Sequence, residues 1–188
     1  MGNKISIDSA TMMNKVFEII EAQRIFNIKL NKLSILVHPK SYVHAIVKFK
    51  NGLIKTLIHE TSMTIPIFNS IYDQDTKNFK TNKINLNSLN NLDFKEVDIK
   101  RYPITEVLKQ FSNKVTLFDT VVVASNDELV DQFLNNKIKF IQINKLLKKI
   151  INLPEFIKYK RKTPVNIVEI INLNDYVRLK TKKLSVLS

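Results

Sequence analysis

The first part of the chain carries apolar side chains at helical spacing. One broad stripe contains Met12, Val16, Ile19, Ile20 and Phe26, the pattern of an amphipathic helix. Asp8 or Ser9 can cap this helix, because a side-chain oxygen there accepts from the first free amides. We therefore expect a helix over about residues 10–26, with residues 4–7 as the end of a short strand or a loop.

Alternating, β-branched runs follow and predict strands. They span residues 34–38, 43–49 and 53–59, and Asn51-Gly52 separates the last two. Asn-Gly between apolar runs is a strong hairpin signal, because both residues tolerate positive φ. We expect an antiparallel meander packed on the first helix, and then a short helix from Pro66 to about Tyr72.

The second half changes to a helical pattern. Residues 73–91 are polar with weak periodicity and are read as a linker, and helices are expected over 104–111, 119–135, 143–151 and 165–170. The predicted fold class is α+β: a helix packed on a small, mostly antiparallel sheet, then a linker and a C-terminal helical bundle. The expected domains are 1–72 (partial catalytic and dimerisation domain), 73–99 (linker) and 100–188 (helical domain).

Composition narrows the possible functions. The 188 residues include 44% hydrophobic side chains, no cysteine and two glycines, Gly2 and Gly52. Two isolated glycines exclude a GxGxxG dinucleotide loop and a Walker phosphate loop, and the lack of cysteine excludes thiolate zinc sites. No apolar run reaches membrane-spanning length. We expect a soluble, cytoplasmic protein with no membrane partner.

The formal net charge of +13 raises the alternative of a basic RNA-binding protein. However, the lysines are dispersed and accompany abundant Asn, Ile, Phe and Tyr, which is typical of an AT-rich genome. The densest basic runs, 158–162 and 180–183, lie near the C-terminus. We therefore expect a solvated surface and no nucleic-acid partner.

Four side chains near the first helix form the best candidate site. Asn14, Lys15 and Glu18 share one helix face, and Ser9 is expected at its N-terminus, beside free amides that favour anions. Lys15 can bind a phosphate, Asn14 can bind hydroxyls, and Glu18 is a hard oxygen ligand suited to Mg²⁺ or Mn²⁺. The same Lys-Glu spacing is also ordinary on helix surfaces. His38, His44 and His59 lack metal-ligand spacing and are expected to be structural or to act indirectly.

The exact residue order of this segment is more specific evidence than the spacing of its polar residues. Residues 1–15 with Glu18 closely resemble the central motif of 1-deoxy-D-xylulose 5-phosphate reductoisomerase. The resemblance continues at 35–44 (with His38-Pro39 and Ser41), 63–67, 92–94, 101–103 and 124–128. It covers residues 1–150 well and the rest loosely. Val16 departs from it, since a glycine is common there.

The resemblance implies an activity and a set of site residues. The family rearranges and reduces 1-deoxy-D-xylulose 5-phosphate to 2-C-methyl-D-erythritol 4-phosphate, an isoprenoid precursor, with NADPH and Mg²⁺ or Mn²⁺. By this resemblance Ser9, Asn14, Lys15 and Glu18 bind the phosphosugar, Lys15 and Glu18 are catalytic, and Glu18 is a metal ligand. Gly2 and Met63 lie near NADPH, and Met1 lies in a mobile loop. The family forms homodimers through the sheet around Asn51-Gly52.

Parts of the family's site have no counterpart in this sequence. The family's NADPH-binding domain, its Asp-Ser-Glu metal carboxylates and its loop histidine all precede the matching region. We expect a C-terminal fragment in which Glu18 is an unpaired surface acid and which is inactive alone. The alternatives are a non-catalytic phosphosugar-binding or dimerisation module that kept the fold, and the RNA-binding protein considered above.

Overall fold

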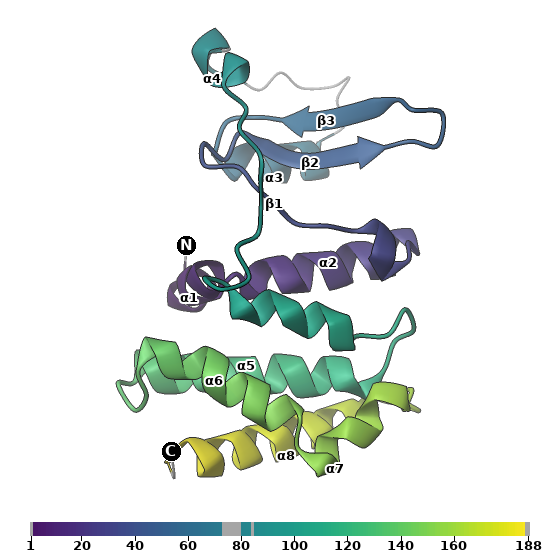
Figure 1. Ribbon diagram of the computed structural model, residues 1–188, viewed down its shortest axis with the longest axis vertical. Helices are drawn as coiled ribbons and strands as arrows, with labels where there is room; N and C mark the ends of the chain where they lie inside the picture. The colour runs from purple at the N-terminus through teal and green to yellow at the C-terminus, as the bar shows by residue number, and fades with distance from the viewer. Residues whose placement is uncertain (1, 73–79, 84, 187–188) are drawn as a thin grey trace. The chain divides into compact units, whose positions relative to one another are not determined.

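The computed structural model describes residues 2–72, 80–83 and 85–186, and the chain folds into two compact units (Figure 1). One unit joins Met1–Ile35 to Asp98–Ser188, and the other is Leu36–Val97. The class is α+β, mostly helical with small antiparallel sheets, as the sequence predicted. The contacts thus group the first 35 residues with the C-terminal helices, which differs from the expected division at 1–72, 73–99 and 100–188.

The larger unit is helical and is built around one long central helix. Its elements are α1 (Asn3–Thr11), α2 (Met13–Phe26), η1 (Leu30–Lys32), η2 (Pro103–Gln110), α5 (Leu117–Leu134), α6 (Phe140–Ile151), α7 (Pro154–Ile157), η3 (Lys158–Arg161) and α8 (Ile167–Val186). Helix α5 packs against α8, α6, α1, α7 and η3, while α2 packs against η2. The central position of α5 explains why ten of its residues are buried.

A single core connects the two ends of the sequence in this unit. Met13 and Val16 from α2 are fully buried in one cluster with side chains of η2, α5, α6, α7 and α8. Val16, where the resemblance led us to expect glycine, therefore contributes a packed side chain to this core. Because hydrophobic burial is the main favourable term in folding, these contacts make α1 and α2 part of the helical unit.

Most of the expected helices in the second half are confirmed. The expected 104–111, 119–135 and 143–151 correspond to η2, α5 and α6, although η2 is a 3₁₀ helix. Helix α6 buries Ile143, Leu146, Leu147 and Ile150, which recur at helical spacing. Helix α8 runs to Val186, so the prediction of a helix ending at Ile170 was wrong. Polar residues such as Asn172 and Asn174 weaken the apolar periodicity after Ile170, so the sequence pattern did not indicate that the helix continues.

The N-terminal segment also differs from its prediction. Residues 4–7, expected as a strand or loop, belong to helix α1. The helical conformation is interrupted at Met12, which separates α1 from α2. Met12 has φ 67° and ψ 13°, in the left-handed region. The expected single helix over 10–26 is therefore two helices, of which the second ends at Phe26 as predicted. Met13 and Val16 are buried, whereas Phe26 is exposed.

The smaller unit contains the expected hairpin. Strands β2 (Val43–Lys48) and β3 (Ile54–Ile58) pair antiparallel, with Val47 opposite Lys55. Gly52 has φ 87°, the conformation for which a hairpin turn selects glycine. The hairpin over Asn51-Gly52 is thus confirmed. Helix α3 (Thr64–Ile71) matches the expected 66–72 within two residues.

The third strand pairs differently from the expected meander. Strand β1 (Leu36–Val37) pairs with β4 (Lys95–Glu96) and forms a separate two-stranded sheet. Pairing over such a distance leaves no local signal in the sequence. The expected linker also carries helix α4 (Leu86–Asn90) besides β4. Residues 73–79 and 84 of this linker lie outside the described residues, as does Met1.

Candidate functional site

The candidate site is built on the corner between α1 and α2. At this corner the Met12 amide donates to the Ser9 carbonyl at 3.1 Å. The Thr11 hydroxyl donates to the carbonyls of Ile7 (3.1 Å) and Asp8 (3.2 Å), and its oxygen accepts from the Met13 amide at 3.4 Å. Thr11 is buried, so these bonds are shielded from water. The corner is therefore held by its own backbone and by one hydroxyl.

Ser9 lies in the last turn of α1, which corrects its expected place at a helix N-terminus. Its carbonyl closes the turn at Met12, so the argument from free amides beside Ser9 was wrong. The N-terminal end of α2 begins instead at Met13, directly before Asn14 and Lys15. The positive end of that helix dipole favours anions at these two residues.

Lys15 and Glu18 form an ion pair across one turn of α2. The Lys15 ammonium lies 2.9 Å and 2.7 Å from the two oxygens of the Glu18 carboxylate. The Glu18 carboxylate is therefore paired within α2, at the Lys-Glu spacing noted in the sequence. Both side chains are about half exposed, at 43% and 53%. An exposed pair of this kind stabilises a fold by no more than about 1 kcal/mol, so a ligand can separate it at little cost.

Asn14 offers a polar atom that lacks a partner. Its side-chain oxygen is buried and finds no hydrogen-bond partner among the described residues. Buried polar atoms are nearly always satisfied, since an unpaired one costs about 1–3 kcal/mol. An acceptor in this state suits a hydroxyl donor of a bound ligand.

A metal ion would find one hard ligand here. Within residues 2–72, 80–83 and 85–186, no three His, Asp or Glu side chains cluster in a way that could hold a metal. Glu18 fits Mg²⁺ or Mn²⁺ as a single carboxylate ligand, and Mg²⁺ ordinarily takes one or two carboxylates together with substrate oxygens and water. The described residues thus fit a part of a metal site.

The remaining predicted residues lie apart in sequence and environment. Gly2 caps the start of α1 and is exposed, and Met63 precedes α3 in the smaller unit with 67% of its surface exposed. The histidines also belong to the smaller unit. His38 Nδ1 lies 3.1 Å from the Asp93 carbonyl, and the rings of His44 and His59 stack at 3.5 Å. These contacts agree with structural roles.

Sequence reasoning missed a polar network that attaches α1 to α5. The Asn126 amide donates to Asp8 Oδ1 at 2.8 Å, and the Lys4 ammonium lies 2.7 Å from Asp8 Oδ2 and 3.0 Å from Asp127. Arg178 of α8 pairs with Asp127 at 2.9 Å. Burial alone lowers the pKa of Lys4, but its bonds to Asp8 and Asp127 outweigh burial and raise that pKa. The motif at 124–128 was the one available signal.

The far end of α2 is attached to the same unit by a second set of contacts. The Gln23 amide donates to the Asn113 carbonyl at 2.7 Å, and Arg24 pairs with Asp119 at 2.7 Å. Burial raises the pKa of the Asp119 carboxyl, although the Arg24 guanidinium opposes this rise. Helix α2 is thus fixed at both ends.

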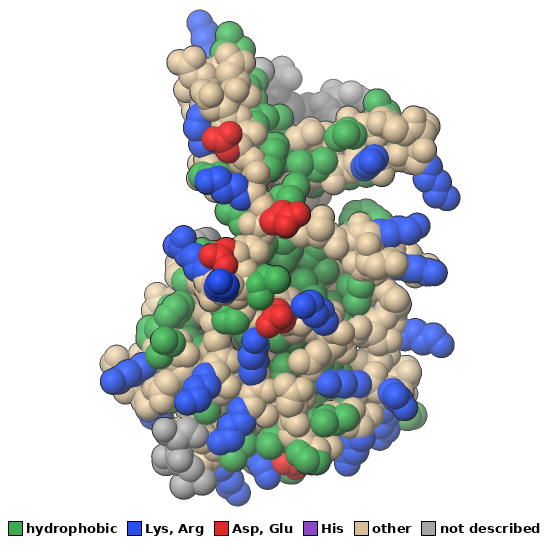
Figure 2. Space-filling model, viewed as in Figure 1, with side chains coloured by type: hydrophobic (Ala, Val, Ile, Leu, Met, Phe, Trp, Pro, Cys, Tyr) green, Lys and Arg blue, Asp and Glu red, His purple; other side chains and the backbone are tan. Residues whose placement is uncertain are grey.

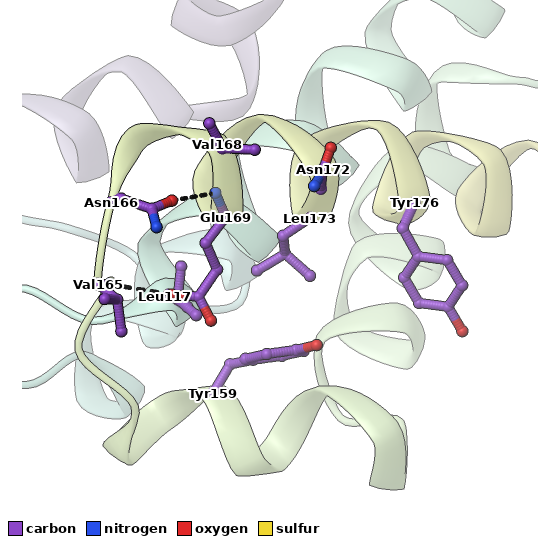
Figure 3. A pocket seen from close by; sticks show the side chains of 9 residues that line it. All are labelled: Leu117, Tyr159, Val165, Asn166, Val168, Glu169, Asn172, Leu173 and Tyr176. Carbon is purple, nitrogen blue, oxygen red and sulfur yellow. Dashed lines mark hydrogen bonds between the residues drawn. The ribbon is translucent and has the colours of Figure 1, made fainter.

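One pocket lies away from the candidate residues, none of which lines it. It has a volume of about 540 Å³ and lies between η3 and the first half of α8, with Tyr159, Leu173 and Tyr176 among its lining residues (Figure 3). Its carboxylate, Glu169, accepts from the Val165 amide at 2.9 Å and pairs with Lys162. These bonds lower the pKa of Glu169. A paired carboxylate of low pKa is a poor general acid or base near neutral pH.

The face shown in Figure 2 has no concentrated positive patch. On the face shown in Figure 2, Lys and Arg side chains are spread over the molecule and do not form one patch. No helix among the described residues is both long enough and apolar enough to cross a bilayer.

Comparison with known proteins identifies the family. Residues 58–180 match the DXP reductoisomerase C-terminal domain, and residues 1–26 match the 1-deoxy-D-xylulose 5-phosphate reductoisomerase C-terminal domain. This chain belongs to the DXP reductoisomerase family. The resemblance found in the sequence is thereby confirmed, and the second match contains Ser9, Asn14, Lys15 and Glu18.

Individual relatives agree with this assignment. The 1-deoxy-D-xylulose 5-phosphate reductoisomerase of Pelagibacter ubique is 59% identical over 99% of this chain, which covers 48% of that relative. The enzyme of Persephonella marina is 36% identical over 84% of this chain and 42% of its own length. The chain spans about half the length of the reductoisomerases that it matches.

Solved structures of the family have the same fold. The Zymomonas mobilis reductoisomerase, solved in complex with NADPH, is 31% identical and aligns over 97% of this chain and 47% of its own, with a TM-score of 0.82. A DOX-P reductoisomerase solved with fosmidomycin and magnesium is 25% identical and aligns over 100% of this chain and 46% of its own, with a TM-score of 0.83.

Proposed function

We propose that this chain supplies the substrate-binding corner and the helical unit of a 1-deoxy-D-xylulose 5-phosphate reductoisomerase. The observation that supports the proposal is the family match of residues 1–26, the range that forms α1 and α2 and contains Ser9, Asn14, Lys15 and Glu18. The activity proposed is NADPH-dependent rearrangement and reduction of the phosphosugar with Mg²⁺ or Mn²⁺. NADPH and magnesium accompany reductoisomerases of similar fold.

Each proposed role follows from the local chemistry. Lys15 leaves its pair with Glu18 to bind the phosphosugar, since a charge-assisted bond to phosphate is stronger than an exposed ion pair. The released Glu18 carboxylate would then be available as one oxygen ligand for Mg²⁺ or Mn²⁺. The unpartnered Asn14 side-chain oxygen accepts a hydrogen bond from a substrate hydroxyl. The Ser9 hydroxyl, in the last turn of α1, provides a further hydrogen-bonding group for the substrate. Gly2 and Met63 are proposed to lie near NADPH.

A chimera tests this proposal directly. Residues 1–188 would replace the matching segment of the Pelagibacter ubique enzyme, which is 59% identical over 99% of this chain. We expect Mn²⁺-dependent NADPH oxidation with 1-deoxy-D-xylulose 5-phosphate. A folded, dimeric chimera without turnover would contradict the function and favour a non-catalytic module.

Single substitutions in the chimera test the residues. Lys15→Ala should raise KM for the phosphosugar by about one to two decades, because one charge-assisted bond contributes roughly 1.5–3 kcal/mol. Glu18→Gln should lower kcat and weaken the dependence on Mn²⁺. Lys109→Ala is the control, since Lys109 forms an exposed pair of the same spacing with Glu106, away from the corner. Unchanged kinetics in both site variants would reject the assignment.

The isolated chain provides a further test. We expect purified residues 1–188 to show no turnover, because Glu18 stands without other clustered metal ligands among the described residues. Removing one member of a catalytic group already costs orders of magnitude. Turnover by the chain alone would contradict this expectation, whereas rescue by an added N-terminal portion of the relative would support it.

We also propose that the chain forms homodimers through the β2–β3 hairpin. Val47, Phe49, Leu53 and Leu57 are 42–59% exposed, and a two-stranded sheet is marginal on its own. A second copy would cover these side chains.

A further inference from the structure

We propose that Asp8 and Asn126 are positioning residues, which hold the α1–α2 corner in the geometry that substrate binding requires. The inference rests on the proposed function of that corner and adds two residues that do not themselves touch substrate. Asn126 lies on α5, far from the corner in sequence, and it reaches the residue directly before Ser9.

The contact between the two side chains is buried and directional. Asp8 is 4% exposed and Asn126 is 0% exposed. Because an ionised carboxylate can only accept, the Asn126 amide must be the donor in the 2.8 Å bond to Asp8 Oδ1. Lys4 occupies the other Asp8 oxygen at 2.7 Å. Both oxygens of Asp8 are therefore held, and the rotamer of Asp8 is set.

From Asp8 the constraint continues into the corner. The Asp8 carbonyl accepts from the Thr11 hydroxyl, and the Thr11 oxygen accepts from the amide of Met13. This chain of bonds ends directly before Asn14 and passes around Met12, whose φ of 67° is unfavourable for a residue with a side chain. Such a conformation persists only where the surroundings enforce it. The bond from Asn126 supplies one such enforcing contact.

A second set of contacts, made by ion pairs, connects the same turn of α5 to both α1 and α8. Asp127, next to Asn126, lies 3.0 Å from the Lys4 ammonium and 2.9 Å from the Arg178 guanidinium. Adjacent residues of α5 thus reach the same face of α1 at two positions one turn apart, Asn126 at Asp8 and Asp127 at Lys4. A displacement of α5 would move Ser9 and Asn14 together, and errors of about 1 Å at a reacting centre can cost about a hundredfold in rate.

Kinetics of the chimera separate positioning from simple stability. Asp8→Asn and Asn126→Ala should each raise KM for the phosphosugar and lower kcat/KM by about tenfold or more, with KM for NADPH unchanged. The double variant Asp8→Asn with Asn126→Asp restores a bond of reversed direction and should recover most of the loss. The control Val130→Ala removes a buried side chain of the same helix outside the polar network.

The outcomes are distinct. Losses in kcat/KM that the double variant recovers and that Val130→Ala does not reproduce would support the inference. It is overturned if Asp8→Asn and Asn126→Ala alter only the melting temperature, as Val130→Ala should. An unmodified chimera without activity would count against the proposed function instead, so a measurement independent of activity is also needed.

Hydrogen exchange on the full 188-residue chain is that measurement. Asn126→Ala should accelerate exchange at the amides of Met12, Lys15 and Val16, which form the bonds of the corner, while amides of α6 keep their rates. Equal rates at the corner in Asn126→Ala and Val130→Ala would overturn the inference even in an inactive chimera.

Discussion

Two residues with positive φ show how single positions determine local structure. Gly52 (φ 87°) closes the hairpin turn, where the absence of a side chain makes the conformation accessible. Met12 (φ 67°) separates α1 from α2 although its side chain disfavours that conformation. The turn at Gly52 can be predicted from the sequence because glycine is favoured at positive φ. The conformation at Met12 depends on the bonds of Thr11 and Ser9 around it.

Substitution of Gly52 tests the turn. Gly52→Ala should lower the free energy of unfolding by about 1 kcal/mol or more, because alanine is strained at positive φ. Gly2→Ala is the matched control, since a methyl group at Gly2 meets no atom within 4 Å and Gly2 has φ −68°. Urea unfolding followed by circular dichroism measures both. A loss at Gly52 no larger than that at Gly2 would contradict the role of the turn.

Glu155 links stability to pH. A hydrogen bond from the Tyr176 hydroxyl and then one from the Lys180 ammonium, at 2.9 Å, lower the pKa of the Glu155 carboxyl. The folded state thus binds this proton more weakly than the unfolded state. The contribution of the carboxylate is present above the ordinary pKa of 4.5 and is lost as pH falls through the lowered folded value.

Glu155→Gln tests this linkage. The difference in unfolding free energy between the parent chain and Glu155→Gln should be present near neutral pH and disappear in acid, measured by urea titration across this range. Tyr176→Phe, which removes the first donor, should reduce the same difference in part. A stability difference that is equal in acid and at neutral pH would show that the charge of Glu155 is not involved.

At the scale of elements, helix α8 shows why an amphipathic pattern can be hard to read. Leu173 is 6% exposed and belongs to the core, whereas Leu179 on the same helix is 61% exposed. Polar residues also occupy buried positions, as Thr181 does with 0% exposure. The buried face of α8 is thus partly polar, and its periodicity is weak in the sequence.

Two identical substitutions on α8 measure this difference between faces. Leu173→Ala should lower the free energy of unfolding by about 2–5 kcal/mol, because it leaves a cavity in the core. Leu179→Ala removes the same atoms from an exposed position and should change stability by less than about 0.5 kcal/mol. Thermal unfolding of both variants gives the comparison. Equal losses would mean that the two faces of α8 are assigned incorrectly.

At the scale of the whole molecule, the exposed apolar face of the hairpin bears on assembly. Because Ala45 lies opposite Leu57 and Val47 opposite Lys55, one face carries Ala45, Val47 and Leu57 together with Lys55. Thr56, between Lys55 and Leu57 on β3, lies on the other face, since side chains alternate along a strand. An exposed apolar patch commonly marks an interface.

Light scattering of the full chain tests the proposed dimer. We expect the parent chain to be dimeric and Leu57→Lys to be monomeric, because a buried, unpaired ammonium destabilises an interface. Thr56→Lys adds the same charge on the opposite face and should leave the dimer intact. A monodisperse monomer of the parent chain would reject the dimer, and equal effects of the two lysines would reject this face as the interface.

Local signals in the sequence determined much of this protein. The Asn51-Gly52 hairpin, the helices over α5 and α6, and the ion-pair spacing of Lys15 and Glu18 each depend on residues close in sequence, so pattern and propensity were sufficient. The residue order from Gly2 to Glu18 also indicated the family. The proposed roles of Ser9, Asn14, Lys15 and Glu18 come from that likeness.

Only the tertiary structure decided how distant segments combine. It assigned residues 1–35 to the C-terminal helices, paired β1 with β4, and connected Asp8 to Asn126. It also showed that the predicted first helix is interrupted at Met12 and that Ser9 lies in the last turn of α1, not at the start of a helix. Contacts between distant residues depend on the shared core and on buried polar partners. The periodicity of a sequence indicates which face of a helix is buried but not which distant residue that face meets, because each residue's partner is set by the packing of the whole unit.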